Sequence, residues 1–219
     1  MPVESTGADL PAVAPGRLTP DGLRARFEQR LHWEPEATEV RWRDDVDPRI
    51  AAVLIALVVR DNGLTVLLTQ RADHLSDHAG QISFPGGRHE PEDPTPIATA
   101  LREAQEEVSL DPSRVEVLGA LPDYLTSTGY RVTPVVSLVH PPLTVHADTL
   151  EVAEIFEVPL DFLMNPAHHE VRVLRWEHGE RRFFAMPYPR ARQGEAGGDY
   201  FIWGATAGML RNFYRFLAA

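Results

Sequence analysis

The feature that most restricts the fold of this chain is an uninterrupted apolar run at residues 50–59, IAAVLIALVV. A helix needs about 20 apolar residues to cross a bilayer, so a run of this length predicts a buried strand instead. The motif DNG at residues 61–63 is a strong hairpin signal, and residues 64–70 then predict the returning strand. Helical and strand-like segments alternate further along, which favours an α/β fold on a mixed β-sheet.

The chain divides at about residue 48. Residues 1–19 are rich in Pro, Ala and Gly without periodicity and predict a loose arm, whereas residues 21–31 carry the apolar stripe of an amphipathic helix. We therefore expect an N-terminal arm and helix at 1–48 and one main domain at 49–219. The main domain should close with a helix, and a homodimer could use either terminal helix.

Composition excludes several classes of function. The net charge of −11 argues against sequence-independent binding to nucleic acid, which needs a basic surface. All 21 basic residues are arginine, so arginine is the only strong cation available to an anionic ligand. The chain has no cysteine, which rules out disulfides, thiol nucleophiles and zinc–thiolate sites. No signal peptide or membrane-spanning run is visible, so we expect a soluble, cytoplasmic protein without a membrane partner.

Residues 96–108 predict a helix on which acidic side chains are crowded. Each residue advances about 100° around a helix, so Glu103, Glu106 and Glu107 share one face. Like charges at this spacing cost roughly 0.2–0.5 kcal/mol. The plain interpretation is a solvated face. The alternative is a site for a divalent cation, because hard cations take oxygen ligands.

The flanking residues favour the cation site. In segment 84–110, FPGGRHEPEDPTPIATALREAQEEVSL, a glycine pair precedes the helix, and Arg102 stands beside the first of the three glutamates. This segment resembles the signature of the Nudix hydrolase family. Three features depart from that signature: Asp93 replaces a glutamate, one extra residue separates it from Arg102, and Ser109 replaces a glycine.

The resemblance implies an α/β/α sandwich with a mixed sheet, together with an enzymatic activity. The reaction would be hydrolysis of the pyrophosphate bond in a nucleoside diphosphate linked to another group, with Mg²⁺ or Mn²⁺ as cofactor. By the family pattern Glu103, Glu106 and Glu107 hold the metal. Glu106, Glu107 and Arg102 form the catalytic set, in which Arg102 braces the glutamates. A metal held there neutralises the diphosphate and activates a water.

The general base is open at this stage. It is either one of the helix glutamates or an acidic residue from elsewhere in the chain. The candidates for a base or an extra ligand are Glu151, Glu154 and Asp93. The plain interpretation of Glu151 and Glu154 is that they are solvent-facing residues of a strand.

Segment 67–87, LLTQRADHLSDHAGQISFPGG, resembles the signature of the coenzyme A pyrophosphatase branch of the family. That branch implies cleavage of coenzyme A or acyl-coenzyme A into 3′,5′-ADP and 4′-phosphopantetheine. Ser76 stands where the branch has an arginine, which keeps open a Nudix activity on ADP-ribose or another nucleotide. A second alternative is a non-catalytic Nudix-like sensor, which the intact glutamate helix disfavours.

The substrate is expected to be a small nucleotide, and five residues are expected to contact it: Arg71, Phe84, Gly86, Gly87 and Tyr130. Arg71 is expected to bind phosphate at the 3′-phosphoadenosine end. Phe84 is either a core residue or a substrate contact. Tyr130 follows Gly129 in a turn that could present its ring to a base.

Overall fold

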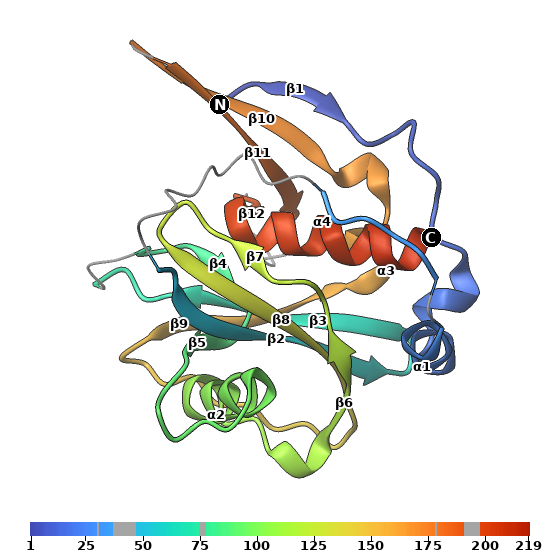
Figure 1. The fold of residues 1–219 in the computed structure, drawn as a ribbon, viewed down its shortest axis with the longest axis vertical. Coiled ribbons are helices and arrows are strands. Elements are labelled where there is room, and N and C mark those ends of the chain that lie inside the picture. The colour runs from blue at the N-terminus through green and yellow to red at the C-terminus, as the bar shows by residue number, and fades with distance from the viewer. Residues whose placement is uncertain (30, 37–46, 75–77, 178, 191–197) are drawn as a thin grey trace.

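Residues 50–59 form most of β2 (Arg49–Arg60), the central strand of the larger of two β-sheets (Figure 1). The computed structural model describes residues 1–219 except 30, 37–46, 75–77, 178 and 191–197. β2 pairs in parallel with β8 (Tyr130–Val139) and antiparallel with β3 (Gly63–Arg71), to which the predicted hairpin joins it. The expected α/β fold on a mixed sheet is confirmed.

The remaining strands of the large sheet lie beside these three. The main order is β4-β3-β2-β8-β6, while β5, β7 and β9 pair with β2, β8 and β3 respectively. Their bounds are β4 (Ile82–Ser83), β5 (Gly86–Arg88), β6 (Val115–Ala120), β7 (Tyr124–Leu125) and β9 (Val152–Pro159). β5 carries the predicted glycine pair and lies against β2.

Two helices cover opposite faces of the large sheet, α2 (Pro96–Val108) and α4 (Gly204–Ala218) (Figure 1). Alternate side chains of β2 point to opposite faces. Leu54 belongs to the core cluster that contains residues of α2, and Ile55 belongs to the cluster that contains residues of α4. Both are fully buried. Because both faces are covered, residues 50–59 of the strand are apolar without interruption.

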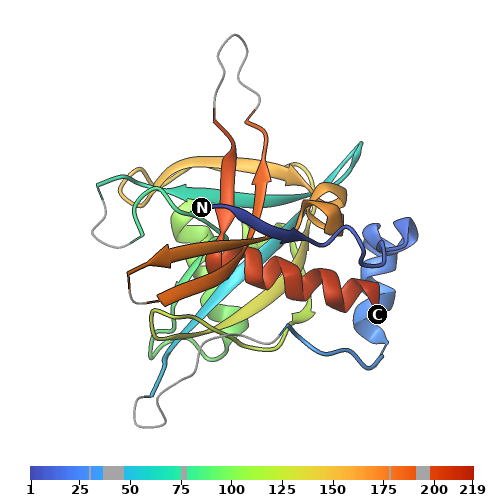
Figure 2. The ribbon, with the colours of Figure 1, turned by 90° about the horizontal axis from the view of Figure 1, so that it is seen from above.

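A smaller antiparallel sheet packs on the far side of α4, and from above β1 lies along its edge (Figure 2). Its strands are β1 (Val3–Thr6), β10 (Glu170–Trp176), β11 (Gly179–Tyr188) and β12 (Tyr200–Trp203). The loose arm expected at residues 1–19 is therefore wrong. Val3 pairs with Arg172, and the N–H of Gly7 donates to the carbonyl of His169 at 2.9 Å. Every β1 side chain is exposed, so no apolar pattern marked the strand.

The N-terminal helix α1 (Pro20–Glu28) ends before residue 31 and packs on the body of the protein. Leu23 is fully buried, and the ring of Phe27 lies 4.7 Å from that of Phe216 in α4. α4 matches the expected final helix, and its apolar residues are likewise buried within the chain. The apolar faces of both terminal helices are thus covered without a second protomer.

Short helical segments connect the remaining strands. They are η1 (Pro15–Leu18), η2 (Pro112–Arg114), α3 (Leu160–Leu163) and η3 (Pro166–His168). Among the described residues, no helix is both long enough and apolar enough to cross a bilayer.

Candidate active site

α2, the helix that carries the crowded glutamates, begins and ends where the sequence predicts. The side chain of Thr95 accepts a hydrogen bond from the N–H of Ala98 at 3.2 Å, and Pro96 occupies the first helical position. At the other end Ser109 adopts a φ of 55°, and its N–H donates to the carbonyl of Gln105 at 3.0 Å. This left-handed conformation favours glycine and costs a serine roughly 1–2 kcal/mol.

The three glutamates of α2 divide between two environments. Glu107 is only 6% exposed, and its carboxylate accepts a hydrogen bond from the N–H of Gly86 at 3.0 Å. Glu103 lies against Gly87, where a Cβ would come within 2.5 Å of the glutamate carboxylate. A larger residue at position 87 would displace the Glu103 carboxylate from its present place. The Glu106 side chain is 59% exposed, so two glutamates face the glycine pair and one faces outward.

Arg102 joins the acidic groups around α2 into one network. Its Nε and Nη2 donate to the two carboxylate oxygens of Asp93 at 3.1 and 3.0 Å, and Nη2 also donates to the carbonyl of Arg88. Its Nη1 lies 3.0 Å from the Glu106 carboxylate and 3.1 Å from that of Glu103. Arg102, followed by the N–H of Glu90, holds the pKa of Asp93 well below its usual range. With both oxygens engaged, Asp93 is placed to fix Arg102.

Glu107 lies in an electrostatically unfavourable place for a carboxylate. Burial raises its pKa to about 7, and the charges of Glu103 and Glu151 add to this effect. The N–H of Gly86 and the charge of Arg71 act in the opposite direction. Burial also raises the pKa of Glu103. Carboxylates therefore outnumber cations at the inner side of α2.

The two acidic candidates ahead of and within β9 have different surroundings. Glu151 lines the same cleft as Glu103 and Glu107 and contributes to their raised pKa values. Glu154 instead accepts a hydrogen bond from the hydroxyl of Tyr200 at 2.6 Å and pairs with Arg190. Of the two, Glu151 joins the helix glutamates and Glu154 does not.

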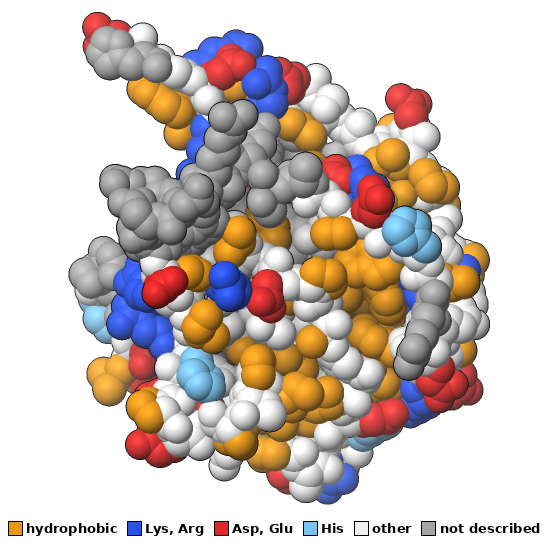
Figure 3. Space-filling model, in the orientation of Figure 1, with side chains coloured by type: hydrophobic (Ala, Val, Ile, Leu, Met, Phe, Trp, Pro, Cys, Tyr) orange, Lys and Arg blue, Asp and Glu red, His pale blue; other side chains and the backbone are white. Residues whose placement is uncertain are grey.

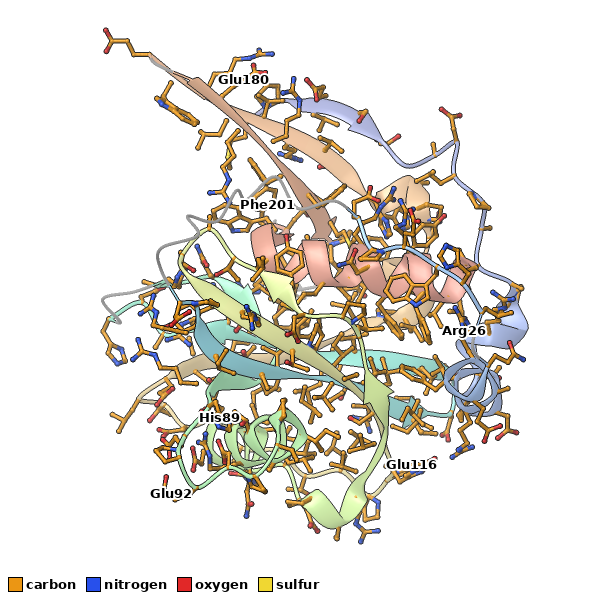
Figure 4. All side chains as sticks on the ribbon, viewed as in Figure 1. Arg26, His89, Glu92, Glu116, Glu180 and Phe201 are labelled. Atoms are coloured by element: carbon orange, nitrogen blue, oxygen red, sulfur yellow. The ribbon has the colours of Figure 1, made fainter. Side chains whose placement is uncertain are left out.

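The glycine pair and the inner glutamates open into a cleft of about 1670 Å³. Tyr130 lines the wall formed by the large sheet, while Trp176, Phe183 and Trp203 from the small sheet line the opposite wall. Figure 4 shows His89 and Glu92 beside α2, and Phe201 on the opposite side of the large sheet. The cleft can therefore hold a ligand much larger than a diphosphate.

The expected substrate contacts differ in how much surface they offer to a ligand in this cleft. Phe84 is 1% exposed and belongs to the core, so it offers almost no surface to a ligand. Arg71 lies close enough to Glu107 to lower its pKa, and its buried Nε has no hydrogen-bond partner in the described part of the chain. Ser76, where the branch signature has arginine, lies outside the described residues.

Sequence reasoning missed two arginines that contact Tyr130 in the cleft, Arg49 and Arg88. Arg88 directly follows the glycine pair, and this adjacency was a usable signal. Arg49 reaches Tyr130 only through the parallel pairing of β2 with β8. No local pattern in the sequence reveals that pairing.

The chemistry of the inner site fits a divalent cation. Its available ligands are carboxylate oxygens, which hard cations prefer, and the clustered negative charge lacks sufficient arginine to balance it. Within the described ranges, however, no three His, Asp or Glu side chains are already grouped as an ion site. Glu106 is the outlying member, because its side chain is 59% exposed whereas that of Glu103 is 15% exposed. The expected set of three ligands is therefore present on one helix but not preassembled.

Comparisons with known proteins agree with the geometry. Residues 48–184 match the family model of the NUDIX domain. A protein of Enterobacter sp. (strain 638) called "Uncharacterized Nudix hydrolase NudL" is 44% identical over 171 residues, covering 77% of this chain and 83% of the relative. A protein of the same name from Escherichia coli (strain K12) is 43% identical over the same length and shares.

Among solved structures, a Nudix hydrolase from M. smegmatis, RenU, is 25% identical, with a TM-score of 0.46 over 56% of this chain and 78% of its own. A C. elegans Ap4A hydrolase binary complex is 18% identical, with a TM-score of 0.45 over 53% and 85%.

Proposed function

The chain belongs to the NUDIX family of hydrolases, and we propose that it cleaves the pyrophosphate bond of coenzyme A or acyl-coenzyme A. The products would be 3′,5′-ADP and the corresponding 4′-phosphopantetheine. The observation that carries a hydrolytic site is the buried Glu107, fixed by the Gly86 N–H and grouped with Glu103 and Glu151 in one cleft. A cytoplasmic location, which the lack of cysteine suits, is part of the proposal.

NUDIX hydrolases generally depend on divalent metals, and we propose Mg²⁺ or Mn²⁺ here. Glu103 and Glu107 would hold the ion from the inner face of α2, with Glu106 as the third ligand. When bound, the ion would neutralise the charge of the diphosphate and lower the pKa of a bound water molecule.

The other residues act on the substrate or on these glutamates. Arg71 binds the diphosphate, because its charge acts on Glu107 and its buried Nε has no partner among the described residues. Glu151 takes the proton of the attacking water, since it is the acidic candidate that shares the cleft with the helix glutamates. Arg102 is a positioning residue that acts through Glu103 and Glu106, and Asp93 in turn orients Arg102.

Coenzyme A is favoured over smaller nucleotides by two features. The coenzyme A signature at residues 67–87 brings Arg71 and the glycine pair to the inner end of the cleft. The opposite wall carries aromatic side chains, which suit the apolar part of a pantetheine or acyl chain. The competing proposal is a Nudix activity on ADP-ribose or another nucleotide, which the departure at Ser76 supports.

A substrate panel tests this function. Coenzyme A, acyl-coenzyme A, ADP-ribose, NADH and 8-oxo-dGTP would be assayed with Mg²⁺ and with Mn²⁺, and the products separated by chromatography. We expect the highest kcat/KM for coenzyme A or an acyl derivative, with release of 3′,5′-ADP. Faster cleavage of ADP-ribose would replace the proposal, and tight binding without turnover of any member would favour a sensor.

A further inference from the structure

Tyr130 holds two arginines side by side in the cleft. The guanidinium of Arg49 lies over the Tyr130 ring, 4.0 Å from its centroid, and donates through Nη2 to the carbonyl of Thr128 at 2.8 Å. Arg88 donates through Nε to the Tyr130 hydroxyl at 2.8 Å. A tyrosine therefore fixes two like-charged groups that would otherwise repel one another.

Strand register places these three side chains on the same face of the sheet. Arg49 is directly opposite Tyr130 in the parallel β2–β8 pair, and Arg88 is opposite Ala51 in the β2–β5 pair. Residues opposite one another, and residues two apart along a strand, share a face. All of them line the cleft. Gly87, one residue before Arg88, lies instead against Glu103 on the α2 side.

Among the residues that the structure describes, the two arginines lack carboxylate partners of the kind that neutralise other arginines of this chain. Neither Arg49 nor Arg88 forms an ion pair with a carboxylate of the described residues. By contrast, Arg182 on the small sheet pairs with Glu4 and Glu180, and acidic and basic side chains lie together there in Figure 3. In a chain of net charge −11, two fixed guanidinium groups that pair with no carboxylate of the described residues point to an anionic ligand.

We propose that Arg49 and Arg88 bind a phosphomonoester on the nucleoside part of the substrate, separate from the diphosphate that is cleaved. This inference rests on the proposed function, in which that group is the ribose 3′-phosphate of coenzyme A. A phosphomonoester carries a charge of about −1.5 to −2 and three acceptor oxygens, which match two guanidinium forks. A single carboxylate would leave one arginine uncompensated.

This assignment changes the expected roles of two residues. Tyr130 is a positioning residue, because the contact with Arg49 occupies a face that a base would otherwise stack on. Arg71 is beside Glu107, at the scissile diphosphate, so it is not the residue that recognises the 3′-phosphate. Preference for a 3′-phosphorylated substrate thus depends on Arg49 and Arg88.

The test compares coenzyme A with dephospho-coenzyme A, which differs only by that phosphate. For Arg49→Gln and Arg88→Gln we expect kcat/KM for coenzyme A to fall about 10- to 100-fold, chiefly through KM, because a charge-assisted contact is lost. Turnover of dephospho-coenzyme A should stay within about twofold of wild type, since those contacts are not made to it. Tyr130→Phe should show a smaller loss in the same direction, because Arg88 loses its acceptor.

Arg131→Gln is the matched control. Arg131 is exposed, is adjacent to Tyr130 in sequence and points to the opposite face of β8, so it changes net charge equally without touching the cleft. Equal losses on both substrates, or no loss on either, would overturn the inference.

A binding measurement separates failure of the inference from failure of the proposed function. Calorimetry with metal-free protein would compare 3′,5′-ADP with 5′-AMP. We expect wild type to prefer 3′,5′-ADP by about tenfold or more and Arg88→Gln to lose that preference. This result would support the phosphomonoester subsite even if coenzyme A is not hydrolysed, whereas equal affinities in wild type would refute it.

Discussion

Replacement of Glu107 by glutamine should abolish most activity and yet make the metal-free protein more stable. Glutamine keeps the shape of the side chain and retains an oxygen that can accept the Gly86 N–H bond. It removes the charge that the proposed metal site requires. We expect kcat to fall by about 10²-fold or more, because the transition state loses a group that stabilises its charge.

The gain in stability follows from the raised pKa of Glu107. Burial raises that pKa from 4.5 to about 7, so the folded chain binds this proton more tightly than the unfolded chain. The loss of stability caused by ionising Glu107 is absent below pH 4.5, increases as the pH rises and is complete above pH 7. Since one pKa unit corresponds to about 1.36 kcal/mol, the ionised carboxylate costs the metal-free fold about 3 kcal/mol at most.

Urea unfolding in the presence of EDTA at pH 5 and pH 8 measures this effect. The free energy of unfolding of Glu107→Gln should exceed that of wild type at pH 8, and the excess should shrink at pH 5. Glu92→Gln, which makes the same change at an exposed position near α2, should match wild type in both stability and turnover. Near-normal turnover in Glu107→Gln would refute the metal assignment, and a pH-independent difference would refute the electrostatic argument.

Three further predictions follow from contacts outside the inner glutamates. His169 is 1% exposed and burial lowers its pKa to about 4, so its own contribution to stability should fall by about 3 kcal/mol between pH 6.5 and pH 4. The difference in free energy of unfolding between wild type and His169→Gln should change by this amount across that range, whereas the difference between wild type and His146→Gln, at an exposed position, should not. Ser109→Gly should raise the free energy of unfolding by roughly 0.5–1 kcal/mol, because glycine adopts the left-handed cap without strain; a loss in denaturant midpoint would contradict this. Asp93→Asn should lower activity at limiting metal by about tenfold through Arg102, with recovery at high metal; a metal titration identical to wild type would exclude this role.

Local patterns predicted the elements that hold the site. The helix at 96–108 is found at the expected bounds, because Pro96 marks its start and the Ser-Leu-Asp-Pro run at 109–112 marks its end. The hairpin after residue 60 and the buried strand at 50–59 were equally local signals. The strand β1 was missed because its pairing with β10 joins residues far apart in the sequence and buries none of its own side chains.

The site itself was only partly predictable. Helical periodicity placed Glu103, Glu106 and Glu107 on one face, but it could not show that Glu106 faces outward while the other two lie against the glycine pair. The choice between Glu151 and Glu154 depended on tertiary contacts with Tyr200 and Arg190. Those contacts join segments that lie far apart in the sequence, and no local pattern reveals them.

Two departures from the family signature offset one another in the structure. Asp93 is shorter than the usual glutamate, and one extra residue separates it from Arg102. The N–H of Asp93 donates to the carbonyl of Glu90 and its side chain accepts from the N–H of Glu90, so a tight turn directs the carboxylate toward Arg102. The two oxygens then meet Arg102 at 3.0 and 3.1 Å, a bidentate pair with the geometry that guanidinium prefers. Added chain length thus compensates for the shorter side chain, and the Asp93 carboxylate reaches the arginine that also contacts Glu103 and Glu106.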